Sequence, residues 1–398
     1  MKEQMRESEL SEGLPGGQEK TYFAVVTLFW ISMYVNIPFQ TPYLKSLGTA
    51  SGTIGLIVGA YGITQVLLRV PVGVFADKIG RHKKIMSAGC LASFCACLIR
   101  SVFCTAAGFF IANLFSGVAA GMWISFFVYY TSKFSSEHQQ TATSRVMIFF
   151  NGGILLGFVI STLCYPILGM ARMCVIGVFA SFAGFILTLM IREKAAEPSD
   201  RSVPELLSVC CGRRIIIFSV IALLQQGIQM STTMSFTNQY IKSCGASDTV
   251  VGFSSIIYML SAVFFAGLAS RGACKKRGGR FWIPLIFCIV AVYCTLVPRI
   301  RFVPLLLIAQ VFPGMSQGFL LTLATSEAMV GVPREKRSTA MGFFNAVYAV
   351  GLTVFPMFTG AVIASAGMSG GYMLLAAIAL ASAVLAAVHY RLAPAENH

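Results

Sequence analysis

Long apolar stretches, separated by short polar segments, dominate the pattern of hydrophobic and polar positions along this chain. Each stretch has roughly 18 residues or more, the length that an α-helix needs to cross about 30 Å of hydrocarbon. Each is expected to be helical, because the bilayer interior has no water to satisfy a broken backbone. We place twelve, near residues 21–44, 52–76, 84–104, 106–131, 145–169, 171–191, 214–240, 247–269, 281–298, 302–326, 338–366 and 369–390. The pattern therefore predicts an all-α membrane protein with twelve transmembrane helices.

Composition and charge agree with this prediction. Apolar residues make up 56% of the 398 residues and charged residues 11%, whereas a soluble domain is nearer one quarter charged. If the N-terminus is cytoplasmic, the cytoplasmic segments hold 23 Lys and Arg residues, as the positive-inside rule expects. The outer loops then hold six, namely Lys45, Arg100, Arg172, Lys242, Arg299 and Arg301. This skew explains the net charge of +15 by topology, so we expect a lipid bilayer and no nucleic acid as partner.

The chain also repeats itself. Residues 43–48 read YLKSLG and residues 240–245 read YIKSCG, 197 positions later; the same offset carries Tyr61 to Tyr258. At an offset of 194, SRVMIFFN at 144–151 returns as STAMGFFN at 338–345. Ordered matches at a nearly constant offset predict two six-helix halves in the same orientation. The expected units are a cytoplasmic tail 1–20, the halves 21–191 and 214–391, a cytoplasmic linker 192–213, and a tail 392–398.

The link between the second and third predicted helices, residues 73–84, reads GVFADKIGRHKK. Gly73 and Gly80 permit close approach and a tight turn. Asp77 and Arg81 are four residues apart, within reach of each other if the turn is helical. The segment resembles the helix 2–3 loop of the major facilitator superfamily, whose pattern is Gly-x-Leu-Ala-Asp-Arg-x-Gly-Arg-Arg/Lys, with Lys78 in the usual Arg position.

The resemblance implies two parallel six-helix repeats with a substrate site between them near the bilayer midplane. It also implies solute transport without covalent chemistry, so we expect no enzyme, and the chain is most like bacterial drug and metabolite permeases. In that family the loop resembles a latch that holds the cytoplasmic side closed, with Gly73, Asp77, Lys78, Gly80 and Arg81 as gating residues here. The second copy, 266–271, has Ser270 in place of the acid. The alternative is that these charges only anchor a short loop.

Arg69 lies inside the second predicted helix, eight residues before Asp77. One interpretation is a snorkelling side chain that reaches the cytoplasmic interface. The other is a gating partner for Asp77 or a contact for the substrate.

Two departures from the family pattern bear on energy coupling. Drug/proton antiporters of the family commonly carry an arginine in helix 4 where this chain has Asn113, and the repeated position is Gln310. No acid falls in mid-membrane in our assignment, and Glu327 near the end of helix 10 comes closest. A buried carboxylate is the usual proton carrier. Proton coupling and uniport therefore both stay open.

Polar and aromatic side chains lie within the predicted spans on helices that line the cavity in the family. They occur in both halves at repeat-related positions, and neutral hydrogen-bonding groups among large aromatics suit a neutral or amphipathic organic solute. The alternative is that the amides join helices, at about 0.6 kcal/mol per hydrogen bond. The predicted substrate-binding residues are Trp30, Tyr34, Asn36, Gln40, Trp123, Phe127, Asn151, Gln225, Gln229, Thr233, Phe236, Gln310, Gln317 and Asn345.

The sequence thus predicts a secondary active or facilitative transporter in the cytoplasmic membrane, with export favoured. An uptake permease for a sugar or nucleoside is the alternative, and a transport-dead sensor or a membrane enzyme are the competing classes. We expect a monomer with both termini in the cytoplasm, no cofactor and, because the 12 Cys and 4 His show no ligand spacing, no metal.

Overall fold

The computed structural model describes residues 14–79, 81–134, 138–193, 205, 208–269, 272–332 and 336–392. Within these ranges, 74–79, 139–140, 272–277, 337–338 and 392 are described by their backbone alone. The predicted tails and the linker 192–213 lie largely outside the described residues, as do Gly80, Ser270 and Arg271.

The described chain is helical and apolar enough to cross a membrane many times. The first half consists of α2 (Gly16–Tyr34), α3 (Ile37–Ser46), α4 (Ser51–Ile79), α5 (His82–Val102), α6 (Ala106–Gly121), α7 (Trp123–Thr131) and α8 (Gln139–Met190). The second consists of α10 (Arg213–Ser231), a π-helix η2 (Thr232–Phe236), α11 (Thr237–Ser243), α12 (Asp248–Ala269), α13 (Gly272–Leu296), α14 (Val303–Ala309), α15 (Val311–Met329) and α16 (Arg337–Leu392). A short 3₁₀ turn, η1 (Ser208–Cys211), precedes α10, and another, η3 (Val297–Arg299), follows α13.

Among the described residues, ten apolar segments are long enough to span a bilayer, and two of them are long enough to span it twice. α8 is interrupted at Gly169 (φ +70°) and α16 at Gly367 (φ +72°), a left-handed conformation that favours glycine. Each long helix therefore forms two antiparallel crossings. The predicted boundaries at 169/171 and 366/369 fall at these glycines, and the all-α class with two parallel repeats is confirmed.

Other spans are broken where the hydropathy pattern predicts continuous helices. The first span changes from α2 to α3 at Val35–Asn36, just before Pro38. The tenth changes from α14 to α15 at Gln310, ahead of Pro313. A proline lacks the N–H that a helix interior uses, and its ring clashes with the carbonyl four residues earlier. The seventh span passes through the π-helix η2, a local widening that is frequent at functional sites.

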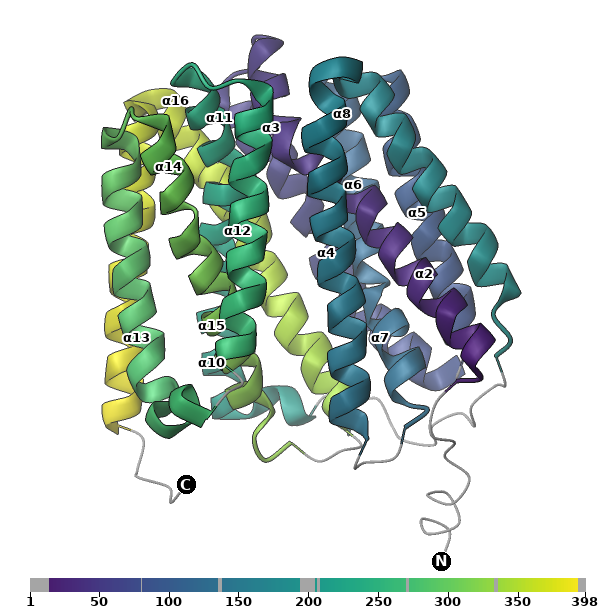
Figure 1. Cartoon of the computed structure of the whole chain (residues 1–398). Helices are drawn as coiled ribbons and strands as arrows, with labels where there is room; N and C mark the ends of the chain where they lie inside the picture. The colour runs from purple at the N-terminus through teal and green to yellow at the C-terminus, as the bar shows by residue number, and fades with distance from the viewer. Residues whose placement is uncertain are drawn as a thin grey trace, which may run out of the picture.

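The two groups of helices, α2–α8 and α10–α16, stand side by side (Figure 1). α2 begins and α16 ends at the lower end of the bundle in this view, which we name the terminal end. The bend of α8 and the ends of α3 and α11 lie at the upper end, which we name the opposite end.

Helices α4 and α16 form the longest contact between the halves. Their backbones approach so closely that a Cβ atom on Gly55 would lie 2.2 Å from the carbonyl oxygen of Pro356. A Cβ on Gly62 would lie 2.2 Å from the hydroxyl of Thr353. Small residues permit such contacts in a membrane, where dispersion and packing replace the hydrophobic effect between helices.

A second contact joins the halves at the opposite end. The hydroxyl of Thr41 on α3 donates to the carbonyl of Ser235 in η2 at 2.6 Å, and the amide of Asn238 on α11 donates to the carbonyl of Pro38 at 3.1 Å. Both carbonyls belong to the broken parts of the first and seventh spans. The breaks thus supply the acceptors through which the halves bind each other.

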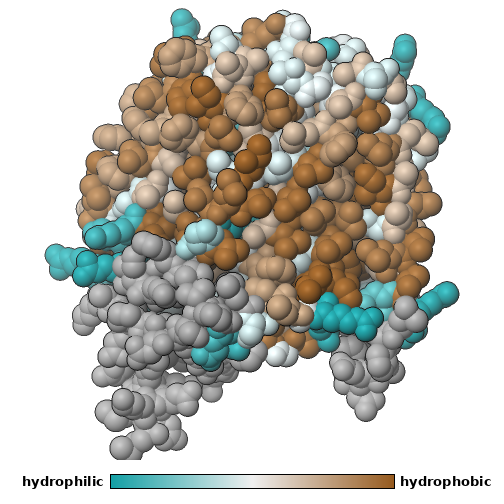
Figure 2. Space-filling view, turned by 180° about the vertical axis from the view of Figure 1, so that it is seen from behind, coloured by the Kyte–Doolittle hydropathy of each residue, from teal (hydrophilic) through white to brown (hydrophobic). Residues whose placement is uncertain are grey.

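The outer surface carries a broad apolar belt (Figure 2). Large side chains such as Leu67, Ile167 and Phe179 are 65%, 81% and 69% exposed. An exposed apolar surface of this extent is typical of contact with lipid. The chain is therefore a multi-pass membrane protein.

Arg100 was expected in an outer loop, and this expectation is wrong. Its side chain is 1% exposed, and its Nη2 donates to Asn113 Oδ1 and to Ser116 Oγ, both at 2.6 Å. Asn113 Nδ2 in turn donates to the carbonyl of Ile57 at 2.7 Å. Arg100 lies two residues before the end of α5, where hydropathy alone gives no sign of whether a side chain turns inward. The guanidinium thus reaches the position at which the family pattern has an arginine on the next helix.

We expect removal of Asn113 to destabilise the protein more than removal of Arg100. Arg100 Nε and Nη1 have no hydrogen-bond partner among the described residues, so the guanidinium already lacks full compensation. Arg100→Met removes two hydrogen bonds together with a buried charge, and should change stability by about 1 kcal/mol or less. Asn113→Leu leaves the charge with fewer acceptors and should lower stability by about 3 kcal/mol. Thermal unfolding in detergent measures both; the reverse order would contradict this account.

Candidate functional site

An aromatic cluster in the first half brings three predicted site residues together. The Trp30 ring on α2 lies 5.0 Å from Trp123 on α7 and 5.6 Å from Tyr34, measured between ring centroids. Phe150 on α8, which the sequence analysis missed, lies 4.5 Å from Trp30 and 5.3 Å from Trp123. Trp30 is 4% exposed and its Nε1 has no hydrogen-bond partner among the described residues. Phe127 is half-buried against the same core.

Four tyrosines connect this cluster to the second half. The phenol of Tyr34 lies close enough to interact with Tyr61 on α4, with Tyr258 on α12 and with Tyr348 on α16. Tyr61 and Tyr258 are related by the repeat offset of 197, which was the one signal in the sequence that marked them. We name Tyr34, Tyr61, Tyr258 and Tyr348 the tyrosine cluster. It lies where the halves meet.

Arg69 lies beside the tyrosine cluster and bridges the halves. Its side chain is 6% exposed, its Nη1 donates to the backbone carbonyl of Asn345 on α16 at 2.6 Å, and its guanidinium carbon lies 4.6 Å from the centre of the Tyr348 ring. The snorkelling interpretation is therefore wrong, because the charged group points into the other half. Asn345 contributes its carbonyl to this contact.

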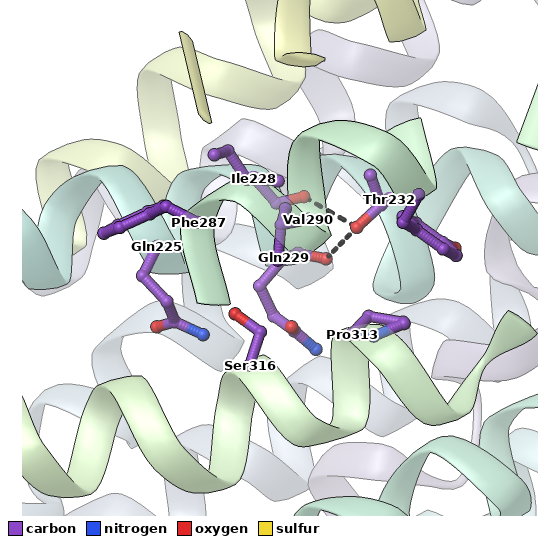
Figure 3. Close-up of a pocket in the computed structure, with 9 residues that line it drawn as sticks. Gln225, Ile228, Gln229, Thr232, Phe287, Val290, Pro313 and Ser316 are labelled. Carbon is purple, nitrogen blue, oxygen red and sulfur yellow. Dashed lines mark hydrogen bonds between the residues drawn. The ribbon is translucent and has the colours of Figure 1, made fainter. Parts of the chain in front are cut away.

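A small pocket with polar and apolar walls lies within the second half, between α10, α13 and α15 (Figure 3). Gln225 Nε2 donates to Gln317 Oε1 at 2.9 Å, while Gln229 Nε2 has no partner among the described residues. Gln229 also interacts with Tyr258, which connects the pocket with the tyrosine cluster. The lining residues are Gln225, Ile228, Gln229, Thr232, Phe287, Val290, Tyr293, Pro313 and Ser316.

Other predicted site residues on α14–α15 and η2 turn toward α13. Gln310 Nε2 donates to the carbonyl of Leu306 at 3.2 Å and lies 3.5 Å from the Tyr293 hydroxyl, which also interacts with Thr233. Phe236 is fully buried in η2. Gln310 and Thr233 therefore interact with Tyr293 on α13, a helix of their own half.

The amides of the first half bind locally. Asn36 Nδ2 donates to Gln40 Oε1 at 3.0 Å, and Asn151 Nδ2 donates to the carbonyl of Met147 on its own helix at 2.9 Å. Asn36 and Gln40 are 1% and 3% exposed. The predicted common face of Asn36 and Gln40 is thus realised, but as a pair of side chains joined by one hydrogen bond at the break between α2 and α3.

The loop between α4 and α5 differs in detail from the expectation. Gly73 lies inside α4, and a Cβ added there would meet no atom within 4 Å, so no close approach requires this glycine. Its predicted role is wrong because α4 continues to Ile79 and the turn comes later. Gly80 and the side chains of Asp77 and Lys78 lie outside the described residues. Arg81 is exposed at the residue that precedes α5.

Glu193, which the sequence analysis missed, caps the first turn of α5. Its carboxylate accepts from the backbone N–H groups of His82 at 2.8 Å and Lys83 at 3.0 Å. An acid is favourable there because the first N–H groups of a helix lack partners and carry partial positive charge. This contact joins the loop to the end of α8 at the terminal end.

The other described acids that form ion pairs are also near helix ends. Glu327 on α15 pairs with Arg214 on α10, and Glu19 on α2 accepts from Arg145 at 3.1 Å and from the hydroxyl of Tyr130. Asp248 pairs with Lys242 at 2.6 Å. No group of three or more His, Cys, Asp or Glu side chains that could hold a metal occurs in the part of the chain that the structure describes.

Comparisons with known proteins agree on one family. The model of the Major Facilitator Superfamily matches residues 22–303 and 245–398. An uncharacterised transporter of this type from Methanocaldococcus jannaschii is 24% identical over 367 residues, which cover 87% of this chain and 91% of that protein. The quinolone resistance protein NorA of Staphylococcus aureus is 26% identical over 137 residues, 34% of this chain and 35% of NorA.

The fold is also found in solved structures. The crystal structure of the nucleoside transporter NupG superimposes with a TM-score of 0.74 at 15% identity, over 94% of this chain and 100% of that one. The family model covers nearly all of the described helices. Membership of one family accounts for both the repeated halves and the loop motif. The chain belongs to the major facilitator superfamily.

Proposed function

We propose that the protein transports a small neutral or amphipathic organic solute across the cell membrane by alternating access, with export favoured. The observation that carries this proposal is the meeting of aromatic and polar side chains from both halves at the tyrosine cluster. A solute bound between two halves is exposed to one side or the other as the halves tilt. Superfamily membership supports the transporter role.

The chemistry around the tyrosine cluster supports an amphipathic solute. Trp30, Trp123 and Phe150 offer ring faces and edges, while the tyrosine hydroxyls and Trp30 Nε1 offer hydrogen bonds. Sites for small organic molecules combine such apolar walls with a few polar groups. The neighbouring glutamines 225, 229 and 317 are proposed to contribute to the site through Tyr258.

The partial likeness to NorA favours export. The NupG fold keeps the alternative open, uptake of a neutral nutrient such as a nucleoside or sugar. Proton coupling and uniport are both compatible with the described acids, since the paired ones lie near helix ends and Glu327 already pairs with Arg214. We propose a monomer that performs no covalent reaction and needs no cofactor.

We further propose that the terminal end faces the cytoplasm, so that both chain termini are cytoplasmic. The basic residues concentrate in segments at that end, as the positive-inside rule expects. The halves would then be residues 21–191 and 214–391, with the linker 192–213 on the cytoplasmic side and the loop after α4 acting as its latch.

Purified protein should be stabilised thermally by members of a diverse solute panel, and those solutes should cross proteoliposome membranes. Trp30→Ala should weaken binding about tenfold, because it removes a central ring and its free N–H. Trp282→Ala is the matched control, since Trp282 stacks on Phe319 in the second half. Transport is compared with and without an imposed pH gradient. Transport rates that are equal with and without the pH gradient would exclude proton coupling. A protein that transports none of the stabilising solutes would contradict the proposal.

Asp77→Asn should change the transport rate several-fold if the loop acts as a latch, because the substitution removes the charge and keeps the shape. Gly73→Ala is the control in the same segment, since its added methyl group meets no atom within 4 Å. Initial rates in proteoliposomes and access of a water-soluble reagent to the terminal end give two readouts. Wild-type values for both in Asp77→Asn would remove the latch.

A membrane-impermeant maleimide should label Cys211 in inside-out vesicles and spare it in intact cells. Cys211 is exposed in η1 at the terminal end, whereas burial and the neighbouring Cys211 raise the pKa of Cys210. Because the thiolate is the reactive form, Cys210 should label more slowly, with a difference that narrows as the pH rises. Cys211→Ser identifies the signal, and Ser46→Cys, exposed at the opposite end, should label in intact cells. Labelling of Cys211 in intact cells would reverse the proposed orientation.

A further inference from the structure

Arg69 is a buried cation to which the described residues offer no acidic partner. It lies between the halves, and the ion pairs of the described residues, Glu19 with Arg145, Asp248 with Lys242 and Glu327 with Arg214, do not include it. Asp77 lies on the same helix eight residues later, about 12 Å further along the axis, which is too far for a direct pair. A buried ionisable group in a membrane span is expensive, so its retention points to a function.

The hydrogen bonds of Arg69 leave most of its donors unused. A guanidinium carries five N–H donors in a planar fork. Nη1 donates to the Asn345 carbonyl, and this is the one hydrogen bond that Arg69 makes with the described residues. Its remaining nitrogens are not among the fully enclosed atoms without a partner, in contrast to Nε and Nη1 of Arg100. Arg69 can therefore still receive a ligand group, and Arg100 cannot.

The surroundings of Arg69 fix the shape of such a ligand. The face of its guanidinium is covered by the Tyr348 ring at 4.6 Å, and Tyr61, two turns earlier on α4, interacts with the same charge. Tyr61 also interacts with Tyr34, and Tyr34 packs against Trp30. The rings of Trp30, Trp123 and Phe150 form an aromatic wall there. Residues 262–265, which directly precede the second copy of the loop segment at 266–271, contain no Lys or Arg, so the cation has no counterpart there. One cation next to an aromatic wall matches one anionic group attached to an aromatic or apolar body.

We propose that Arg69 binds the carboxylate of an amphipathic monocarboxylate, and that this is the substrate class of the protein. The inference rests on the proposed transport function and narrows it. A planar carboxylate accepts two parallel hydrogen bonds from a guanidinium fork, which gives both strength and orientation. The phenol hydroxyls of Tyr34 and Tyr61 supply further donors, and the rings of Trp30 and Trp123 bind the solute body. The carboxylate of the substrate then supplies the negative charge that the described acids do not offer to Arg69.

The test compares acids with their uncharged counterparts. Benzoate, cinnamate and 2-naphthoate are each paired with the primary amide of the same skeleton, and dissociation constants are measured by thermal stabilisation and tryptophan fluorescence of the full-length protein in detergent. We expect at least one acid to bind the wild-type protein about tenfold or more tightly than its amide. The preference should persist from pH 6 to pH 8, where a carboxylate stays ionised.

Substitutions assign the preference to Arg69. Arg69→Gln should abolish the preference for the acid and leave the affinity for the amide unchanged, while Arg69→Lys should keep part of it because the charge remains. Arg172→Gln is the control, since Arg172 is an exposed arginine outside the tyrosine cluster. Arg69→Lys also provides the readout if Arg69→Gln fails to fold.

Equal affinity of the wild-type protein for acid and amide, or an acid preference that survives in Arg69→Gln, would overturn the assignment. Stabilisation by none of the acids would overturn it as well. Transport of amides or other neutral solutes in proteoliposomes with exclusion of the acids would overturn this inference alone. Failure of every stabilising solute to cross the membrane would instead remove the transport function on which it rests.

Discussion

The structure depends on the absence of water in the hydrocarbon interior. Backbone groups in this region must bind each other, so the described chain crosses the bilayer as helices and turns at its ends. In the first and seventh spans, carbonyls at the breaks find partners in the opposite half. Ser235 and Pro38 accept hydrogen bonds from Thr41 and Asn238. In these two spans the irregular backbone thus lies at the contact between the halves.

The same constraint governs charged side chains. Near the helix ends, carboxylates have basic or backbone partners, as Glu193 has at the start of α5 and Glu327 has in Arg214. Two buried arginines have neutral partners among the described residues instead. Arg100 is enclosed by Asn113 and Ser116 within one half, whereas Arg69 reaches from one half to the other and retains open donors. Their different surroundings separate a structural cation from a candidate ligand-binding one.

The two repeated halves share one framework, and the positions at which they differ carry the charged groups of the candidate site. Tyr61 and Tyr258 lie at matching positions, and both interact with Tyr34 in the tyrosine cluster. In contrast, the Asn113 position binds an arginine in the first half, while the matching Gln310 faces Tyr293 in a neutral network. Arg69 has no basic counterpart in the residues that precede the second copy of the loop segment. A pair of similar halves thus forms a site with one charged side, which gives a bound solute a defined orientation relative to the two halves.

Hydropathy and repetition, read from the sequence alone, predicted the all-α fold with two repeats and placed span boundaries at 169/171 and 366/369, where the structure has glycine breaks, because each depends on local composition and spacing. The family resemblance also predicted Trp30, Tyr34 and Trp123 as cavity-lining residues, and the structure brings their rings together. Only the tertiary structure decided which groups the ends of long side chains contact. Arg69 binds a backbone carbonyl of Asn345, Glu193 caps a distant helix, and Gln310 turns toward α13. Such contacts depend on how each helix is rotated and on backbone carbonyls, which every residue carries. The order of side chains along the chain therefore does not predict them.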